Sequence, residues 1–231
     1  MTGEKNDAQM ENFRLGRPAL VCRWRLAART LPLENRHLRA LSRRVVNGAP
    51  VSPQLVAWAK QHIEWTLGAG AALHPDGVLM VIVDEEGRAA MTVGPYDPLP
   101  VTTVSALAER ALGAAREADV TGVAPEGLWL VRGEELVRDG APERPLSGAA
   151  SLIADLARTA GIPVACEEGV ARAVMDGTAR YDEAFLVSDE HGVVPAAGAS
   201  GPRARRLADG YARLLESARR AARPGASAVG A

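Results

Sequence analysis

Lysine, cysteine and aromatic residues are scarce in this chain of 231 residues. Only Lys5 and Lys60 are lysines among the 27 basic residues, so almost all of the positive charge is arginine, as in proteins from GC-rich genomes. The formal net charge is −1, so no overall field attracts a nucleic acid or an anionic membrane. These absences exclude the functions that depend on a strongly basic surface.

The two cysteines and the short hydrophobic runs indicate in which cellular compartment the protein works. Cys22 and Cys166 lie in apolar, strand-like segments, which predicts buried free thiols and not a disulfide or a metal pair. No apolar run approaches the length of about 18 residues that a membrane span needs, and the polar start MTGEKNDAQMEN does not resemble a signal peptide. We therefore expect a soluble cytoplasmic protein with no membrane partner, no nucleic-acid partner and no metal.

The first hundred residues alternate strands and helices. Ala19–Ala27 has the alternation of a strand, with Trp24 on one face and Arg23 and Arg25 on the other. Hydrophobic spacing predicts further elements: helices over Glu34–Val46 and Pro53–Leu67, a buried strand over Gly77–Asp84 and an antiparallel return over Ala89–Val93.

A proline-rich segment, Gly94–Pro100, is the best candidate for a domain boundary, because its three prolines disfavour both helix and central strand. We expect a disordered leader over 1–16, an N-terminal domain over 17–94, a linker over 95–103, a C-terminal domain over 104–222 and a flexible tail over 223–231. Within the C-terminal domain we expect helices over Val104–Ala118, Gly148–Ala160, Val170–Met175 and Pro202–Ala222. We expect a hairpin over Leu128–Val137 and strands over Ile162–Cys166, Glu183–Val187 and Val193–Pro195. In the helix over Gly148–Ala160, Leu152, Ile153 and Leu156 should face inward.

The order of these elements, with GIPV in one strand and DEAFLVSDEHGVVP in the next pair, resembles the C-terminal domain of the class IV aminotransferases. This family of fold-type IV pyridoxal-phosphate enzymes includes branched-chain and D-amino-acid aminotransferases and aminodeoxychorismate lyase. Further matches are Gly201-Pro202 opening the last helix and Leu33–Leu38 opening the first. The resemblance covers roughly residues 17–215, with a deletion near Ala115–Pro125.

The resemblance implies an α/β fold of the two-domain α+β kind: a small N-terminal α/β domain, a C-terminal α/β domain and a cleft between them. It also implies a homodimer, since family members complete each cleft with a loop of the partner chain. Trp58 and Trp65, seven residues apart on one predicted helix, suit packing or a dimer interface better than a catalytic site.

The chain departs from the family at every position that would hold the cofactor. Ala40 replaces the phosphate-binding arginine, Thr102 falls near the position of the lysine and Gly122 near that of the acidic residue on the pyridine nitrogen. The phosphate-holding Gly-Ile-Thr becomes the segment 148–150, Gly-Ala-Ala. Since a pyridoxal enzyme holds its cofactor on a lysine amine, these losses predict that no Schiff base forms, and pyridoxal phosphate is implied by resemblance only.

Five polar residues would line the family's cleft. Arg23 and Arg25 are candidate binders of a substrate carboxylate, because two guanidiniums at i and i+2 point to one side of a strand. Tyr96 in the linker, and Ser188 and His191 in the turn after the EAFLV strand, are candidate catalytic residues. The alternatives are a solvated strand face for the arginines, packing on prolines for Tyr96 and simple exposure for His191.

Three functions remain open. The first is an enzyme that works without pyridoxal phosphate on a small anionic substrate, carboxylated or acyl, by elimination, isomerisation or cyclisation. The second is a non-catalytic pseudoenzyme or scaffold that partners an active homologue. The third is a conventional transaminase or lyase, which would require Lys60 to reach the cofactor from the N-terminal domain.

Overall fold

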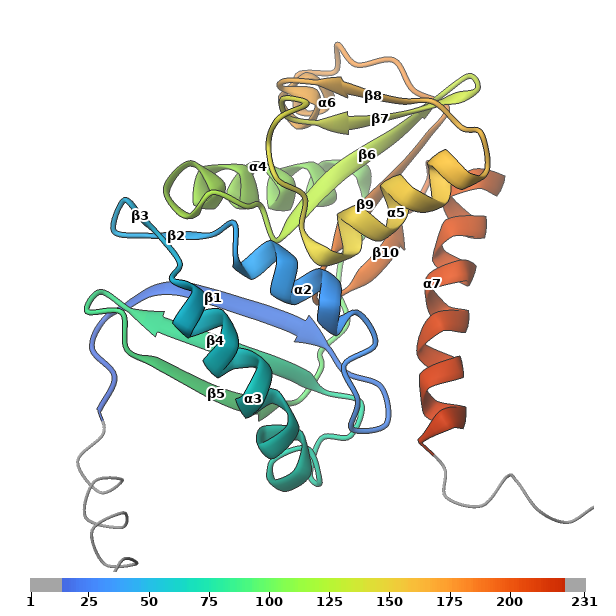
Figure 1. Ribbon diagram of the computed structural model, residues 1–231. Coiled ribbons are helices and arrows are strands. Elements are labelled where there is room, and N and C mark those ends of the chain that lie inside the picture. The colour runs from blue at the N-terminus through green and yellow to red at the C-terminus, as the bar shows by residue number, and fades with distance from the viewer. Residues whose placement is uncertain (1–13, 223–231) are drawn as a thin grey trace, which may run out of the picture.

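The computed structural model, which describes residues 14–222, contains two main sheets whose strands are mostly antiparallel (Figure 1). The first sheet has the order β1-β4-β5, from β1 (Pro18–Arg25), β4 (Val78–Asp84) and β5 (Ala89–Gly94). The second has the order β10-β9-β6-β7-β8, from β6 (Glu126–Arg132), β7 (Glu135–Asp139), β8 (Val164–Glu167), β9 (Glu183–Ser188) and β10 (Gly192–Pro195). Only β7 and β8 pair in parallel in that second sheet. In the described part of the chain, no helix has the length and apolarity to cross a bilayer.

The three-stranded sheet packs one face against the core helix and leaves the other partly exposed, as the alternation in its first strand predicts. Cys22 and Trp24 are buried in a core with Ala59 and Ile63 of α3 (Pro53–Ala69). The N-terminus of α3 is capped by Ser52, whose hydroxyl oxygen accepts the Leu55 N–H. Because Arg23 and Arg25 alternate with the buried residues, they lie on the opposite face of β1 from α3.

The helix predicted over Glu34–Val46 is too long. Helix α2 covers Glu34–Leu41, and the chain then forms a small hairpin of β2 (Val45–Val46) and β3 (Ala49–Pro50). Asn47 and Gly48 both have positive φ, as the Asn-Gly turn of a two-residue hairpin requires, and this sequence signal was overlooked. Arg44 precedes the hairpin: its buried guanidinium donates to the Val123 carbonyl and to Thr121 Oγ1, which draws the chain away from the helix axis.

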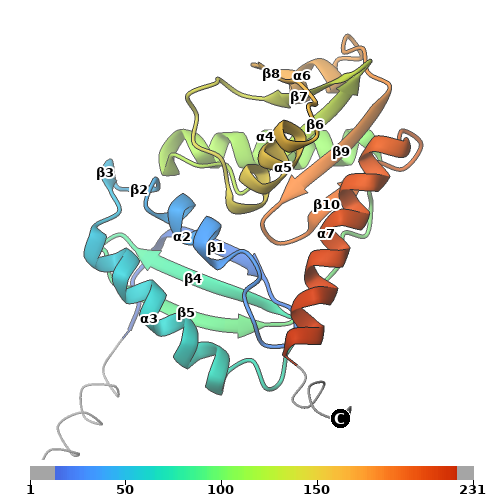
Figure 2. The ribbon, with the colours of Figure 1, turned by 45° about the vertical axis from the view of Figure 1, so that its right-hand side comes forward.

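Helices cover both faces of the five-stranded sheet (Figure 2). On one face α5 (Gly148–Thr159) and α7 (Pro202–Ala221) pack on Trp129 and Phe185. On the other, α4 (Val104–Thr121) and α6 (Val170–Met175) pack on Leu128 and Leu186. The strands are therefore apolar on both sides, which explains why EAFLV reads as a continuous hydrophobic run.

The two sheets are joined along the chain by residues 95–102, which form neither helix nor strand, as expected of Gly94–Pro100. Helix α7 gives a second link: it runs from the larger sheet past the end of the smaller one (Figures 1 and 2). There Arg219 Nε lies 2.7 Å from Asp76 Oδ1. The division into separate domains remains a prediction.

Two burial predictions were wrong. Leu156, expected to face inward, is 40% exposed, because the core side of α5 is taken by Ile153 and Ala157. Cys166 is a free thiol but only partly buried, since β8 is an edge strand. The leader is described only from residue 14, and the tail predicted over 223–231 falls wholly outside.

Candidate functional site

Three of the five predicted site residues meet where β1, residues 95–100 and the turn after β9 come together. The Arg25 N–H donates to the Asp189 carbonyl, at 3.1 Å, which ties the end of β1 to that turn. The Arg25 guanidinium carbon lies 3.3 Å from the centroid of the Tyr96 ring, and the Tyr96 and His191 ring centroids are 5.7 Å apart. We call Arg23, Arg25, Tyr96, Glu190 and His191 the junction cluster.

Arg23 belongs to the junction cluster but already has a partner. Its Nε lies 2.8 Å from Glu190 Oε2, and its side chain is 52% exposed. Burial raises the pKa of Glu190, and the Arg23 guanidinium opposes that rise. Arg23 therefore neutralises an acid of the turn on the solvent side of the cluster, while Arg25 lies deeper.

Two buried nitrogens of the junction cluster have no hydrogen-bond partner among residues 14–222: Nη1 of Arg25 and Nδ1 of His191. Buried polar atoms are nearly always paired, so two orphans in one cluster indicate a place for a ligand or water. Burial lowers the pKa of Arg25 from its ordinary value, with Tyr96 and Tyr211 acting against that shift.

The His191 ring is neutral at physiological pH. Burial lowers its pKa to about 4, and the guanidiniums of Arg110, Arg23 and Arg25 add to the shift. Burial also raises the pKa of Tyr96, so its phenol keeps its proton. The cluster thus presents a guanidinium cation, a neutral imidazole and a phenol, a set that can hold an anion and exchange a proton.

Tyr211 of α7 is a neighbour of the cluster that the site prediction from the sequence did not include. It is buried, and burial raises its pKa, with Asp189 adding to that rise. Gly192 makes room for it: its φ is +71°, and a Cβ there would overlap the Tyr211 ring. The sequence offers no signal for this contact, because Gly192 opens β10 and Tyr211 lies on α7, beyond that strand and the loop after it.

Ser188 supports the turn instead of meeting the other candidates. It is 2% exposed, and its hydroxyl oxygen accepts the N–H groups of Glu190 and His191, at 3.2 and 3.1 Å. These bonds shape the turn that carries His191 toward Tyr96. We therefore place Ser188 as a positioning residue.

The N-terminus of α5 receives a carboxylate from the same turn. Asp189 Oδ1 accepts the Ala149 N–H at 2.8 Å, and its Oδ2 lies 3.6 Å from His37 Nδ1. The His37 ring stacks on Trp24, with centroids 5.1 Å apart. Burial would raise the pKa of Asp189, but His37 and the Ala149 N–H outweigh it and hold the pKa below its usual value.

Asp189 thus occupies a position where a helix N-terminus attracts anions. Gly148 is packed against His37, and a Cβ on this glycine would overlap the ring. Sequence reasoning considered Ser188 and His191 on either side of Asp189 and missed it. An acidic residue in a turn that faces a helix N-terminus was the available signal.

Thr102, which falls near the position of the family's cofactor lysine, lies in a backbone-bonded segment before α4. The Thr102 carbonyl accepts the Ala197 N–H, and Thr103 caps α4. Lys60 is exposed on α3, on the opposite side of the three-stranded sheet from Arg23 and Arg25. Lys5 lies outside the described residues.

Comparison with known proteins gives structural likeness alone, because no family model and no curated protein matches the sequence. A candidate 4-amino-4-deoxychorismate lyase from Legionella pneumophila has a TM-score of 0.58 at 10% identity, over 88% of this chain and 96% of that one. A fold IV transaminase from Curtobacterium pusillum gives 0.56 at 13% identity, over 86% and 84%. An aminotransferase from Brucella abortus bound to pyridoxal phosphate gives 0.52 at 15% identity, over 88% and 94%.

These neighbours share one architecture with this chain over nearly its whole described length. Identities of 10–15% speak for the fold and leave the chemistry to the residues of the site. The resemblance drawn from the order of sequence elements is confirmed at this level: the chain has the fold of the fold-type IV pyridoxal-phosphate enzymes, the branched-chain aminotransferases and aminodeoxychorismate lyases.

Proposed function

We propose that this chain is a divergent protein of this fold that acts on a small anionic molecule at the junction cluster, without pyridoxal phosphate. One observation carries the proposal: the Asp189 carboxylate accepts the Ala149 N–H at the N-terminus of α5. By the sequence resemblance, that helix start corresponds to the segment that holds the cofactor phosphate. Here the chain supplies the anion itself.

The residues present do not fit the cofactor. A phosphate at the start of α5 would meet the buried Asp189 carboxylate, and two like charges at a site closed to water repel strongly. The His37 ring fills the space beside Gly148. Lys60 is exposed on α3 and offers no amine near the junction cluster.

An absorbance spectrum tests the absence of the cofactor. Purified protein incubated with pyridoxal phosphate should show no imine band at roughly 400–430 nm, where a lysine Schiff base of this cofactor absorbs. A band that Lys60→Ala abolishes and Lys5→Ala leaves in place would contradict the proposal. Lys5→Ala is the matched control, because it removes the other lysine of the chain.

The junction cluster favours a carboxylated or acyl ligand. Arg25 Nη1 is a buried donor without a partner, and a carboxylate is the acceptor that suits it best. Neutral His191 can take a proton at Nδ1, and the Tyr96 phenol can return one, which is the requirement of an elimination or isomerisation next to a carbonyl. In this proposal Arg25 binds, His191 and Tyr96 transfer protons and Ser188 holds the turn.

A non-catalytic binding or scaffold role is the second candidate, and a specific contact favours it. The Arg25 guanidinium carbon lies over the Tyr96 ring, and Arg23 is paired with Glu190, so both cations have interactions within the chain. A ligand would have to approach Nη1 of Arg25 or displace Tyr96. Under either candidate we propose a homodimer, by analogy with the family that the fold resembles.

A further inference from the structure

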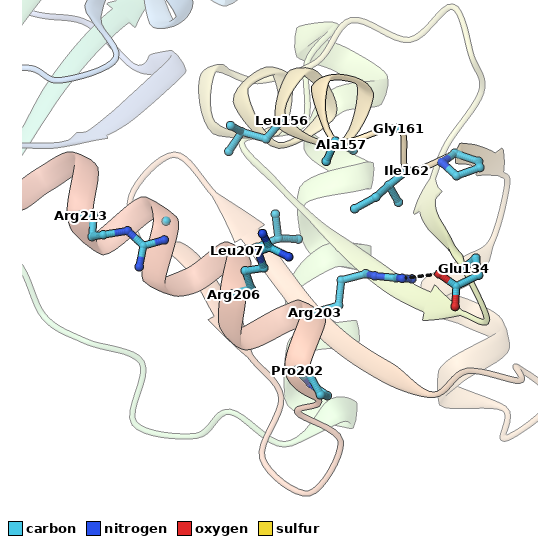
Figure 3. Close-up of a pocket in the computed structure, with 13 residues that line it drawn as sticks. Glu134, Leu156, Ala157, Gly161, Ile162, Pro202, Arg203, Arg206, Leu207 and Arg213 are labelled. Atoms are coloured by element: carbon cyan, nitrogen blue, oxygen red, sulfur yellow. Dashed lines mark hydrogen bonds and ion pairs between the residues drawn. The ribbon is translucent and has the colours of Figure 1, made fainter.

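A hollow lies between α5 and α7 on the outer side of the five-stranded sheet, apart from the junction cluster. Its volume is about 800 Å³, within the range of small-molecule sites. Figure 3 shows Leu156 and Ala157 of α5 on one side, Leu207 of α7 on the other and Ile162 of the loop that follows α5. We call this hollow the α5–α7 groove.

The floor of the α5–α7 groove is apolar and open to solvent. Leu156 is 40% exposed, and Leu207 and Ile162 are partly buried. A single exposed leucine on a helix is common. Here Leu156 lies beside the apolar side chains of a second helix. The result is a continuous apolar strip that water covers unfavourably.

The rim of the groove is basic. Arg203, Arg206 and Arg213 stand at positions i, i+3 and i+10 on one side of α7 (Figure 3). Among the described residues that line the groove, Glu134 is the single carboxylate, and it pairs with Arg203 at 2.8 Å while remaining 94% exposed. Arg206 and Arg213 form no ion pair with any described residue. Three guanidiniums facing one carboxylate leave this rim with excess positive charge in a chain whose net charge is −1.

We infer that the α5–α7 groove binds a small amphipathic anion, an aliphatic or acyl chain that carries a carboxylate. The apolar strip would cover the chain, and Arg206 and Arg213 would bind the head group. This site is distinct from the junction cluster, with which it shares no residue, and the inference does not depend on the proposed function.

Calorimetric titration of the full chain with octanoate tests the inference. Arg206→Ala and Arg213→Ala should each weaken octanoate binding by about three- to tenfold, as expected for charge-assisted contacts at a partly exposed site. Arg205→Ala is the matched control: it removes the same charge from the same helix at a residue that does not line the groove, and affinity should not change. Octanol, which has the same chain and no charge, should bind at least tenfold more weakly than octanoate.

A second variant tests the floor. Leu156→Glu places a carboxylate in the apolar strip at an exposed position, where the fold tolerates it, and should abolish octanoate binding. Equal affinity for octanoate and octanol, or wild-type affinity in both Arg206→Ala and Arg213→Ala, would overturn the inference. Co-sedimentation with phosphatidylglycerol vesicles in the absence of octanoate binding would also overturn it, because the groove would then belong to a membrane surface.

Discussion

At the scale of single residues, the junction cluster depends on side chains with unusual surroundings. Arg25 and His191 each bury one nitrogen that no described residue satisfies. Leaving such atoms unpaired costs about 1–3 kcal/mol each, and proteins tolerate that cost mainly at functional sites. The neighbouring Arg23 has no such orphan atom, is 52% exposed and is already paired with Glu190.

Arg25 and Arg23 should therefore differ in their effect on ligand binding. Arg25→Ala should weaken the binding of a simple carboxylate such as pyruvate or glutarate by about 1.5–3 kcal/mol, as for a charged hydrogen bond. Arg23→Ala should change it by less than about 1 kcal/mol, because Arg23 is half exposed, already pairs with Glu190 and has no unpaired buried nitrogen to offer a ligand. Titration followed by NMR measures both. If both variants retain full affinity, the site lies elsewhere and the scaffold role is favoured.

His191 should make stability depend on pH. Its folded pKa is about 4 and its ordinary value is 6.5, so between these pH values the unfolded chain binds a proton that the folded chain does not. Stability from this group is complete above pH 6.5 and falls as the pH drops toward 4. In the wild type this loss of unfolding free energy should amount to about 1–2 kcal/mol, after allowance for partial exposure. In His191→Gln it should be absent.

Urea unfolding at pH 7.5 and pH 4.5 measures this difference. The free energy of unfolding should fall less in His191→Gln than in the wild type over that interval. Parallel pH profiles for the two proteins would show that the ring titrates normally in the folded chain.

At the scale of elements, carboxylates from the five-stranded sheet cap two of the helices packed on it, α6 and α7. Asp139 at the end of β7 accepts the N–H groups of Gly169 and Ala171 at the start of α6. Glu183 on β9 accepts the N–H of Arg203, at 3.1 Å, and of Ala204, at 2.6 Å, at the start of α7. The residues before these two helices provide no side-chain cap, so tertiary contacts satisfy their free N–H groups.

Glu183→Gln should destabilise the fold by about 1–2 kcal/mol, because a neutral amide loses the charge that favours a helix N-terminus and places an NH₂ group against backbone donors. Glu134→Gln is the control: its carboxylate is 94% exposed and pairs with Arg203 of the same helix, and less than about 0.5 kcal/mol should be lost. Denaturant midpoints give both values. Equal midpoints for the two variants would mean that Glu183 does not cap α7.

At the scale of the whole molecule, α3 carries an aromatic column on its outer side. The rings of Trp58 and His62 are stacked with centroids 4.4 Å apart, and those of His62 and Trp65 are 5.0 Å apart. Trp65 is 62% exposed, which is unusual for so large an apolar side chain. Such a column suits an interface between two copies of the chain.

The proposed homodimer predicts twice the chain mass of 24.3 kDa in light scattering at micromolar concentration. Trp65→Ser should raise the dimer dissociation constant by about tenfold or more if α3 forms the interface, since exposed tryptophans are frequent binding hot spots. Lys60→Ser, an exposed change on the same helix, is the control. A monomer mass for the wild type would rule out the dimer, and a dimer unaffected by Trp65→Ser would place its interface elsewhere.

The sequence by itself determined most of the elements and their order; the end of α2 and the β2–β3 hairpin are the exceptions. Alternation placed Arg23 and Arg25 opposite Trp24, and the ordered set of strands and helices was enough to identify the fold. The cap of α3 is also local, because Ser52 directly precedes that helix. These features depend on local periodicity and capping, which a single segment carries. The approach of Tyr96 to His191 was inferred from the resemblance, which supplied the topology that periodicity lacks.

Only the tertiary structure decided what the polar residues do. Asp189 at the N-terminus of α5 and the groove beside Leu156 both result from segments that lie tens of residues apart along the chain. Local sequence cannot indicate such meetings, because the partner of a buried charge is chosen by the packing of whole elements. The elements of this protein are encoded locally, and its candidate sites are encoded by the way those elements pack.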